Sequence, residues 1–333
     1  MGIQVSAPTR IDLCGGTLDI WPIFLMLKSP LTINIAINVN ATVILRSRKD
    51  KKISIKSIDS EEEVNFLSIE EVDESKMLLL PTSVVKYFSP KSGFDLEINS
   101  GSPRGAGIGG SSSLLIALIS AFSRFCNKKL SFEKLIQLAR DLECGIIKVP
   151  AGIQDYIPAA IGGINLIHLT PGGFKIEKLS ISLNELNQRV VLCYTGQPRN
   201  SGINNWDVTK KFIDGDQEVK KNLQGIADVS RIIGDNLKKK RFDEVGNLIS
   251  KEWDQRLKLS PGISTDLIVK TLDAGRSAGA IAGKVCGAGG GGCLFLYCKP
   301  NRKDGVTKAI SKVGVEIIPF EFVKNGVEVK NAK

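Results

Sequence analysis

The sequence of 333 residues predicts an α+β protein of two domains. Its length is sufficient for two separate hydrophobic cores. In both halves, segments with an apolar residue at every second position, typical of strands, alternate with segments of helical periodicity. In the second half the elements follow the order of a split βαβ, ferredoxin-like domain. We therefore expect one domain at residues 1–185 and a second at residues 186–333.

Composition narrows the class of protein. A hydrophobic content of 42% with 24% charged residues is ordinary for a globular protein. A net charge of +10 suits anionic partners. The short basic runs at residues 49–52 and 238–241 lack interleaved aromatic residues, which argues against nucleic acid. No apolar run approaches the roughly 18 residues of a membrane span. Seven cysteines without a C-x-x-C pair or a secretory signal predict reduced thiols and a cytoplasmic protein.

The first half is expected to hold a sheet and three helices. Apolar alternation predicts strands at residues 1–6, 33–45, 53–55, 94–98 and 164–169. Helical patterns predict helices at residues 76–88, 114–126 and 131–143. The segment 114–126 is apolar nearly all round, so this helix should be central and buried. Ser131 is placed to cap the last of the three.

The second half is expected to begin with a strand at residues 189–195. A loop rich in hydrogen-bond donors follows at residues 196–202, and helices fill most of residues 217–258. The remaining predictions are a helix capped by Ser264, strands at 281–286 and 293–299, a helix at 302–313, a strand at 315–322 and an Asn325-Gly326 hairpin turn.

The most informative stretch is the glycine-rich segment from Pro103 to Ser113, which leads into the central helix. Four glycines within six residues allow the backbone N–H groups to approach a ligand closely. Three serines follow at a helix start, where N–H groups are unpaired and the helix dipole is positive. This pattern predicts a phosphate site, with hydroxyls that could hold Mg²⁺. The alternative is a tight turn with a serine N-cap.

Two well-known phosphate loops fit less well. Gly105, Gly107 and Gly110 match the dinucleotide pattern G-x-G-x-x-G, which requires a following strand and an acidic residue about 20 positions on. Glu133 has that spacing but lies in a predicted helix. The P-loop signature fails because Gly283-Lys284 is followed by Val285 instead of Ser or Thr.

Other polar residues are ambiguous from local sequence. The segment Ala7–Asp19 reads equally well as a ligand-facing strand and loop or as a surface turn. Asp141 and Glu143 lie near a predicted helix C-terminus, an unfavourable place for carboxylates that a bound metal ion would explain. Asp155 fits a turn former better than a catalytic carboxylate on this evidence alone. His168, the single histidine, is expected to be structural, which leaves few histidine-based zinc or catalytic sites.

Three glycine sites in this order resemble the GHMP family of small-molecule kinases. Ala7–Asp19 is similar to the first motif of the family, and Pro103–Ser113 to its Pro-x-x-x-Gly-Leu-Gly-Ser-Ser motif. Lys284–Cys293 is similar to its Gly-Ala-Gly-Gly-Gly-Gly motif. The resemblance implies an N-terminal ribosomal-protein-like α/β domain and a C-terminal ferredoxin-like α+β domain, with ATP and the substrate between them.

Within the family, the resemblance is closest to the D-glycero-D-manno-heptose 7-phosphate kinases. Gly15–Asp19 resembles their Gly-Gly-Gly-Thr-Asp, although Leu18 stands where Thr is usual. Gly107–Ser112 resembles Gly-Leu-Gly-Gly-Ser-Ser, and Gly152–Asp155 resembles Gly-x-Gln-Asp, followed by Tyr156 where Gln is common. The Gly-Glu-His of galactokinases is absent from the first motif.

The resemblance also implies roles for individual residues. Asp155 would take the proton of the sugar hydroxyl, with Arg10 beside it and the transferring phosphoryl group. Asp19 would bind the sugar hydroxyls, and Ser111 and Glu143 would hold Mg²⁺. The nucleotide residues would be Pro103, Gly105, Ala106, Gly107, Ile108, Gly109, Gly110, Ser111 and Ser112, and further sugar contacts would be Gly16, Thr17, Gly289 and Gly290. Arg199, in the donor-rich loop, is our candidate for binding a phosphate on the acceptor.

These expectations describe a kinase that uses ATP and Mg²⁺. The predicted reaction converts D-glycero-D-manno-heptose 7-phosphate into the 1,7-bisphosphate. The alternatives are another anomeric sugar kinase, fucokinase-like or galactokinase-like, a dinucleotide-dependent oxidoreductase, and a non-catalytic nucleotide-binding module. The expected partner is a small-molecule sugar or sugar phosphate, not nucleic acid or membrane, and the sequence leaves open whether the protein forms a homodimer.

Overall fold

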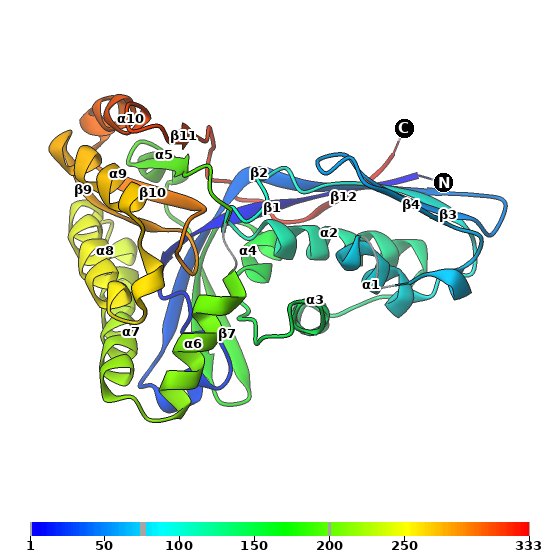
Figure 1. Ribbon diagram of the computed structural model, residues 1–333, viewed down its shortest axis with the longest axis horizontal. Helices are drawn as coiled ribbons and strands as arrows, with labels where there is room; N and C mark the ends of the chain where they lie inside the picture. Colours follow the sequence, from blue (N-terminus) through cyan, green and yellow to red (C-terminus); the bar gives the residue numbers. More distant parts are fainter. Residues whose placement is uncertain (1, 74–77, 199–200, 333) are drawn as a thin grey trace.

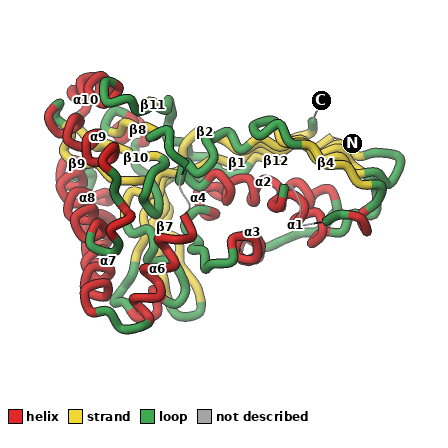
Figure 2. Tube along the Cα trace, viewed as in Figure 1, coloured by secondary structure: helices red, strands yellow, loops and turns green. Residues whose placement is uncertain are grey.

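The computed structural model describes residues 2–73, 78–198 and 201–332 (Figure 1). Two β-sheets organise the molecule, and each is covered by helices (Figure 2). The larger sheet runs from the right of Figure 1 to its lower centre, where β7 lies, and the smaller sheet lies at the upper left. Both sheets meet at the end of the first strand, where the candidate site is found.

Strands β1 (Gly2–Cys14) and β2 (Leu31–Ser47) form the spine of the larger sheet. Because β2 is long, residues 42–47 pair with one neighbouring strand and residues 31–35 with another. In the described residues the order is β12-β1-β2-β5-β3-β4, and β6 pairs with β2 and β7. The other strands are β3 (Ile53–Ser57), β4 (Glu63–Phe66), β5 (Phe94–Asn99), β6 (Ile164–Thr170), β7 (Gly173–Leu179) and β12 (Glu328–Asn331).

Helix α2 (Gly110–Phe125) is the central helix of the first half, as predicted. Its side chains from Ser112 to Ile119 are all buried, because the helix packs against β1 and β2 on one side and against α1 (Leu79–Phe88) and α3 (Phe132–Ile147) on the other. Ser131 caps α3 as predicted, accepting a hydrogen bond from the Lys134 N–H. A short helix, α4 (Tyr156–Ile161), completes the layer on this face of the sheet (Figure 1).

The second half contains the predicted ferredoxin-like domain. Strands β8 (Val190–Tyr194), β9 (Ala280–Val285), β10 (Cys293–Cys298) and β11 (Glu316–Ile317) form an antiparallel sheet in the order β11-β8-β10-β9. Helices α9 (Asp266–Ser277) and α10 (Lys303–Ser311) complete the split βαβ pattern. Helices α7 (Gln217–Lys238) and α8 (Phe242–Leu257) pack together and reach from β9 to β1 and β2.

Some elements differ from the prediction. Several elements were not predicted: the 13-residue helix α6 (Ser201–Ile213) and the shorter elements β4, β7, α4, α5 (Leu183–Asn187) and the 3₁₀ turns Ile23–Met26, Ile69–Glu71, Pro261–Ile263 and Pro300–Arg302. Thr265, not Ser264, caps α9. The strand predicted at residues 315–322 ends at Ile317, after which Phe322 forms an isolated bridge with Ile37.

The Asn325-Gly326 hairpin prediction is wrong. This segment lies against Gly162, and the chain then continues into β12, which pairs with β1 of the larger sheet. Asn325 and Gly326 form no hydrogen-bonded turn, and the strand that follows them pairs with a segment more than 300 positions away in the sequence. The domain boundary after residue 185 falls within α5 and stays a prediction.

Two expectations from composition can be compared directly with the structure. All seven cysteines are free thiols. Among the described helices, none combines the length and apolar character needed to cross a bilayer.

Candidate active site

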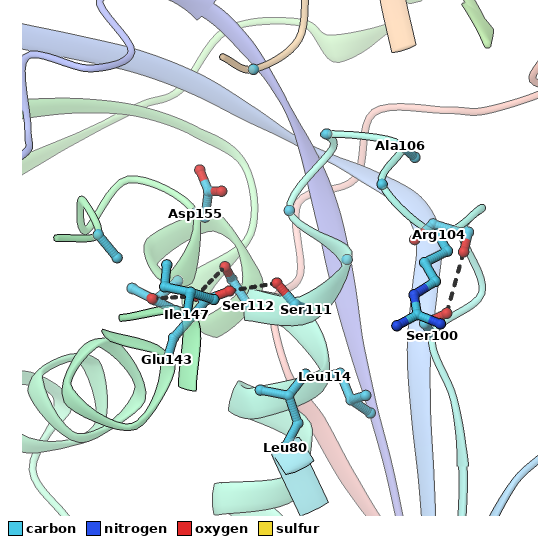
Figure 3. A pocket seen from close by; sticks show the side chains of 18 of the residues that line it. Leu80, Ser100, Arg104, Ala106, Ser111, Ser112, Leu114, Glu143, Ile147 and Asp155 are labelled. Atoms are coloured by element: carbon cyan, nitrogen blue, oxygen red, sulfur yellow. Dashed lines mark hydrogen bonds between the residues drawn. The ribbon is translucent and has the colours of Figure 1, made fainter. Parts of the chain in front are cut away.

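A cleft of about 940 Å³ lies where the two halves meet. Its walls come from the end of β1, the glycine loop before α2, the inner face of α3, the start of α4 and the loop after β9 (Figure 3). The predicted site residues that line it are Arg10, Gly16, Thr17, Asp19, Pro103, Gly105, Ala106, Gly107, Gly109, Gly110, Ser111, Ser112, Glu143 and Asp155. Segments from most of the chain therefore converge on one cleft.

The glycine loop has the geometry of an anion cradle. Gly105, Gly107 and Gly109 have φ values of +71°, +75° and +78°, which L side chains adopt only with strain. Gly109 is the N-cap of α2 and supplies no side-chain cap, so the first N–H groups of the helix face the cleft. The alternative of a serine N-cap is wrong, because the serines lie inside the first turn. The Ile108 side chain is buried beneath the loop.

The third glycine site, Lys284–Cys293, supports the second, Pro103–Ser113. The Cys293 N–H donates to the Ala106 carbonyl at 2.6 Å, and a Cβ on Gly292 would lie 2.6 Å from the same oxygen. From this loop, Gly287 and Ala288 line the cleft. Gly289 and Gly290 instead lie against Ile263, whose carbonyl accepts from the Gly290 N–H at 2.9 Å.

Arg10 and Asp155 form an ion pair beside the glycine loop. The Arg10 Nε and Nη2 atoms lie 2.8 and 2.7 Å from Asp155 Oδ1. Arg10 Nη1 donates to the carbonyls of Gly107 at 2.8 Å and Cys286 at 2.9 Å, so one side chain joins both glycine loops. Burial lowers the pKa of Arg10, but Asp155 and Asp12 outweigh it and raise the pKa, so the guanidinium stays charged.

The position of Asp155 argues against a simple turn former. Its side chain is 28% exposed to the cleft, and it makes no cap to α4 although it occupies the N-cap position. A Cβ on Gly109 would lie 3.6 Å from the Asp155 Cβ, which places the carboxylate next to the start of α2. The carboxylate therefore lies where a phosphate held by this helix start would meet a second substrate.

Glu143 is held by three hydroxyl groups. Ser111 Oγ donates to it at 2.5 Å, Ser112 Oγ at 3.0 Å, and the Tyr156 hydroxyl also donates (Figure 3). Burial raises the pKa of Glu143, and these hydrogen bonds oppose the rise. Helix α3 continues to Ile147, so the prediction that Glu143 lies in the last helical turn is wrong.

This donor set fits Mg²⁺. A carboxylate and hydroxyl oxygens at a helix N-terminus are the hard ligands that this cation prefers. In the described residues no group of three or more His, Cys, Asp or Glu side chains could hold a metal by itself. The remaining ligands would therefore come from phosphate oxygens and water, as is usual for Mg²⁺ with nucleotides.

Asp19 stands at the end of a buried turn, which excludes the alternative of a surface turn. Its side chain accepts the Gln154 N–H at 2.9 Å, and burial raises its pKa to about 6. Two glycines make room for carboxylates at this turn. A Cβ on Gly152 would lie 1.9 Å from Asp19 Oδ2, so Gly152 makes room for Asp19 itself, and a Cβ on Gly16 would lie 2.4 Å from Asp12 Oδ2, so Gly16 makes room for the neighbouring Asp12.

Three further expectations from the sequence concern Arg199, His168 and the dinucleotide-binding alternative. Arg199 lies outside the described residues. His168 is a surface residue of β6 that contacts Glu177 at 3.3 Å, in keeping with a structural role. Helix α2 is followed by α3 instead of a strand, so the βαβ unit of a dinucleotide site is not formed.

Sequence reasoning missed a group of buried charges behind the Asp19 turn. The members are Asp12, Glu252, Arg256 and Lys284. A signal was available, because Lys284 interrupts an apolar strand, and Glu252 and Arg256 are spaced four residues apart on one helix face.

Comparison with known proteins agrees with this architecture. Residues 80–163 match the GHMP kinases N terminal domain, and residues 235–316 match the GHMP kinases C terminal domain. A D-glycero-alpha-D-manno-heptose 7-phosphate kinase of Campylobacter jejuni is 28% identical over 98% of both chains. A bifunctional fucokinase/GDP-fucose pyrophosphorylase of Arabidopsis thaliana is 26% identical over 90% of this chain, which matches 30% of that protein.

Solved structures share the whole fold. A D-glycero-D-manno-heptose 1-phosphate kinase from Bacteriodes thetaiotaomicron superposes with a TM-score of 0.81 at 21% identity, covering 99% of both chains. A putative sugar kinase from Campylobacter jejuni gives 0.80 at 26% identity, covering 99% of this chain and 98% of that chain. Lactococcus lactis galactokinase in complex with galactose gives 0.79 at 19% identity, covering 98% and 95%.

Proposed function

Since the chain belongs to the GHMP kinase family and is a sugar kinase, we propose that it transfers the γ-phosphoryl group of ATP to the anomeric hydroxyl of a heptose phosphate. The favoured acceptor is D-glycero-D-manno-heptose 7-phosphate and the product its 1,7-bisphosphate. We place this activity in the cytoplasm, where free thiols persist. The observation that carries the proposed reaction is the Arg10–Asp155 pair at the start of α2.

The chemistry follows from this geometry. The triphosphate would lie on the glycine loop and the open N–H groups of α2. Mg²⁺ held by Ser111 and Glu143 would neutralise charge on its oxygens. Asp155 would accept the proton of the attacking hydroxyl, and Arg10 would compensate the charge that gathers between the reactants. Since phosphoryl transfer needs mainly in-line positioning, the rigid contacts of Arg10 to both glycine loops support this role.

Asp19 would orient the acceptor. Its carboxylate lies in the same cleft as Asp155, and Gly16 and Thr17 belong to the turn that presents it. A charged carboxylate accepts hydrogen bonds from sugar hydroxyls more strongly than a neutral group does. This end of the cleft therefore suits a hydroxyl-rich ligand.

A second candidate acceptor is a neutral sugar, as in a fucokinase-like or galactokinase-like enzyme. Within the described residues, the cations that line the cleft are Arg10, Arg104 and Arg256. Arg10 pairs with Asp155 and Arg256 with Glu252, and Arg104 lies across the glycine loop from Asp155 (Figure 3). A phosphate on the acceptor would thus need a further cation, for which Arg199 stays our candidate.

The test is an acceptor panel with ATP and Mg²⁺. Heptose 7-phosphate, the unphosphorylated heptose, fucose, galactose and mannose are compared by ADP release, and phosphorus NMR locates the new phosphate. We expect the highest kcat/KM with heptose 7-phosphate and a product phosphorylated at the anomeric position. Preference for an unphosphorylated sugar would select the second candidate, and ADP release without any sugar product would contradict both.

The phosphate contact can be tested in the same panel. Arg199→Met should raise the KM of heptose 7-phosphate strongly while the KM of ATP and of unphosphorylated heptose stay nearly constant, because only the first carries the second phosphate. Equal effects on all three substrates would remove Arg199 from the site.

A further inference from the structure

A buried ion network lies behind the turn that carries Asp19. Glu252 of α8 stands at its centre, with Arg256 Nη2 at 2.5 Å and Lys284 Nζ at 3.2 Å from its Oε1 atom. Lys284 Nζ also lies 3.2 Å from Asp12 Oδ2. The side chains are at most 2% exposed. Two carboxylates and two cations are therefore sealed between β1, β9 and α8, where they balance in charge.

Arg256 links this network to the turn. Its Nη2 donates to the Gly16 carbonyl at 2.9 Å, and its Nη1 donates to Thr17 Oγ1 at 3.3 Å. The Gly15 N–H reaches Glu252 Oε1 at 3.5 Å. Thus α8, which belongs to the second half of the chain, holds three successive residues of a turn from the first half.

This turn has a conformation that needs external support. Thr17 has φ +79°, an uncommon and strained conformation for a β-branched residue. Strained residues persist only where the surrounding structure fixes them. The guanidinium supplies a planar fork of donors on separate nitrogens that holds a carboxylate, a carbonyl and a hydroxyl at once, whereas the three donors of a lysine radiate from a single nitrogen.

The charges of the network also hold Arg256 in its position against the turn. Burial would raise the pKa of Glu252, but Arg256 and Lys284 outweigh it and lower the pKa, so the carboxylate stays ionised. Asp12 completes the balance from β1, two residues along the same strand from Arg10. The network therefore connects the acceptor turn and the catalytic strand through a single rigid cluster.

We propose that Arg256 is a positioning residue for the sugar acceptor: it fixes the turn Gly15–Asp19 so that Asp19 faces the acceptor. This inference rests on the proposed function for the identity of the ligand. It assigns part of acceptor recognition to α8, although this helix contributes no group that is expected to contact the transferred phosphoryl. Loss of Arg256 loosens the turn and weakens acceptor binding, while the ATP cradle stays intact.

The test compares Arg256→Met and Arg256→Lys with the wild type and with Arg189→Met. Arg189 is a matched control, because it is also largely buried and paired with two carboxylates, Glu185 and Asp243, but it does not touch the turn. In Arg256→Met, Glu252 and Asp12 share Lys284 as their remaining cation, so each carboxylate keeps a contact but the cluster loses its charge balance and some stability. Thermal melting first establishes that each variant folds.

Kinetics should separate the substrates. For Arg256→Met we expect the acceptor KM to rise about tenfold or more, the size expected when a hydrogen bond from a charged group is lost, with the ATP KM within about twofold. Arg256→Lys should be intermediate, and Arg189→Met should leave both KM values unchanged. An unchanged acceptor KM in Arg256→Met, or equal increases for both substrates, would overturn the proposal.

A second measurement does not depend on the proposed reaction. Hydrogen exchange of a peptide that covers residues 12–20 should become faster in Arg256→Met and stay at the wild-type rate in Arg189→Met. Unchanged exchange would overturn the positioning role. If the wild type phosphorylated no sugar while the turn still loosened in Arg256→Met, the proposed function would fail and the role of Arg256 in holding the turn would stand.

Discussion

At the scale of single residues, Asp155 gives the sharpest test of the proposed reaction. A positioned general base contributes typically about 10²–10⁴-fold to a rate. Asp155→Asn keeps the shape but cannot accept a proton, so we expect kcat to fall by about this factor, towards the lower end because an anomeric hydroxyl is comparatively acidic. ATP affinity should stay nearly constant. Steady-state kinetics and calorimetry measure the two quantities.

The control for Asp155 is Asp243→Asn. Asp243 also pairs with an arginine, Arg189, but far from the cleft lining. It should keep wild-type kcat. An Asp155→Asn protein that melts normally and retains more than about half of the wild-type kcat would exclude Asp155 as an essential base.

Asp19 should make both stability and acceptor binding depend on pH. Burial raises its pKa from 3.8 to about 6, so between these values the folded protein holds a proton that the unfolded chain has lost. Asp19 therefore favours folding less as the pH rises from about 4 to 6, and above pH 6 it costs about 3 kcal/mol at about 1.4 kcal/mol per pH unit. Asp19→Asn should accordingly raise the melting temperature at pH 8 more than at pH 4.

Asp19→Asn should weaken the binding of the sugar acceptor while it stabilises the fold. In the wild type the acceptor KM should fall as the pH rises through about 6, where Asp19 becomes charged, and Asp19→Asn should remove this dependence. Stability gain together with loss of acceptor binding is typical of a functional residue. A variant that lost stability at pH 8, or kept the pH dependence of KM, would contradict this account.

At the scale of elements, α3 contributes to the site through Glu143. Glu143→Gln replaces a charged ligand by a neutral one, so turnover should need a higher Mg²⁺ concentration, measured as the midpoint of a Mg²⁺ titration. Asp141→Asn is the control, because Asp141 lies two positions away on the same helix and is 63% exposed. If both variants titrated like the wild type, Glu143 would have no role in metal binding.

The loop before α2 should bind phosphate through its backbone. Gly107→Ala adds strain of about 1–2 kcal/mol at φ +75° and changes the N–H directions of the cradle. We expect ATP affinity measured by calorimetry to fall at least tenfold. Gly172→Ala is matched to it, with φ +85° and no atom within 4 Å of the added Cβ, so it shares the strain but not the site. Equal ATP affinity in the two variants would contradict the assignment.

Elements were predictable where local pattern and tertiary packing agree. The apolar helix α2, the Ser131 cap and the alternating strand β2 follow directly from periodicity and capping, and they occur as predicted. Short elements such as α4 were missed because six residues carry too little periodic signal. Strand β12 was missed because its pairing with β1 is set by packing between the two ends of the chain, which no local pattern records.

At the scale of the whole molecule, the residues in and behind the site form two groups, one that could be named from the sequence and one that could not. Glycine loops carry local signals, so their residues could be named from spacing, and the roles of Asp155 and Glu143 came from the family resemblance. The buried network of Asp12, Glu252 and Lys284 depends on three segments that meet only in the folded protein. Lys284 stands out as a charge within an apolar strand, but no local pattern records its partners, so only the fold reveals that these charges are buried together.

The contact between the two halves can be tested at Gly292. An added Cβ would lie 2.6 Å from the Ala106 carbonyl, at φ +75°, so Gly292→Ala must push the third glycine loop away from the second, which precedes α2. Since the Cys293 N–H donates to that same carbonyl at 2.6 Å, the hydrogen bond that joins the two halves should also weaken. We expect a loss of stability beyond the strain of about 1–2 kcal/mol expected for Gly172→Ala, together with a higher KM for ATP, because Ala106 belongs to the phosphate loop. Denaturant unfolding and initial rates at varied ATP measure both effects. A Gly292→Ala protein as stable as Gly172→Ala, with unchanged ATP KM, would show that the second half does not brace the nucleotide loop.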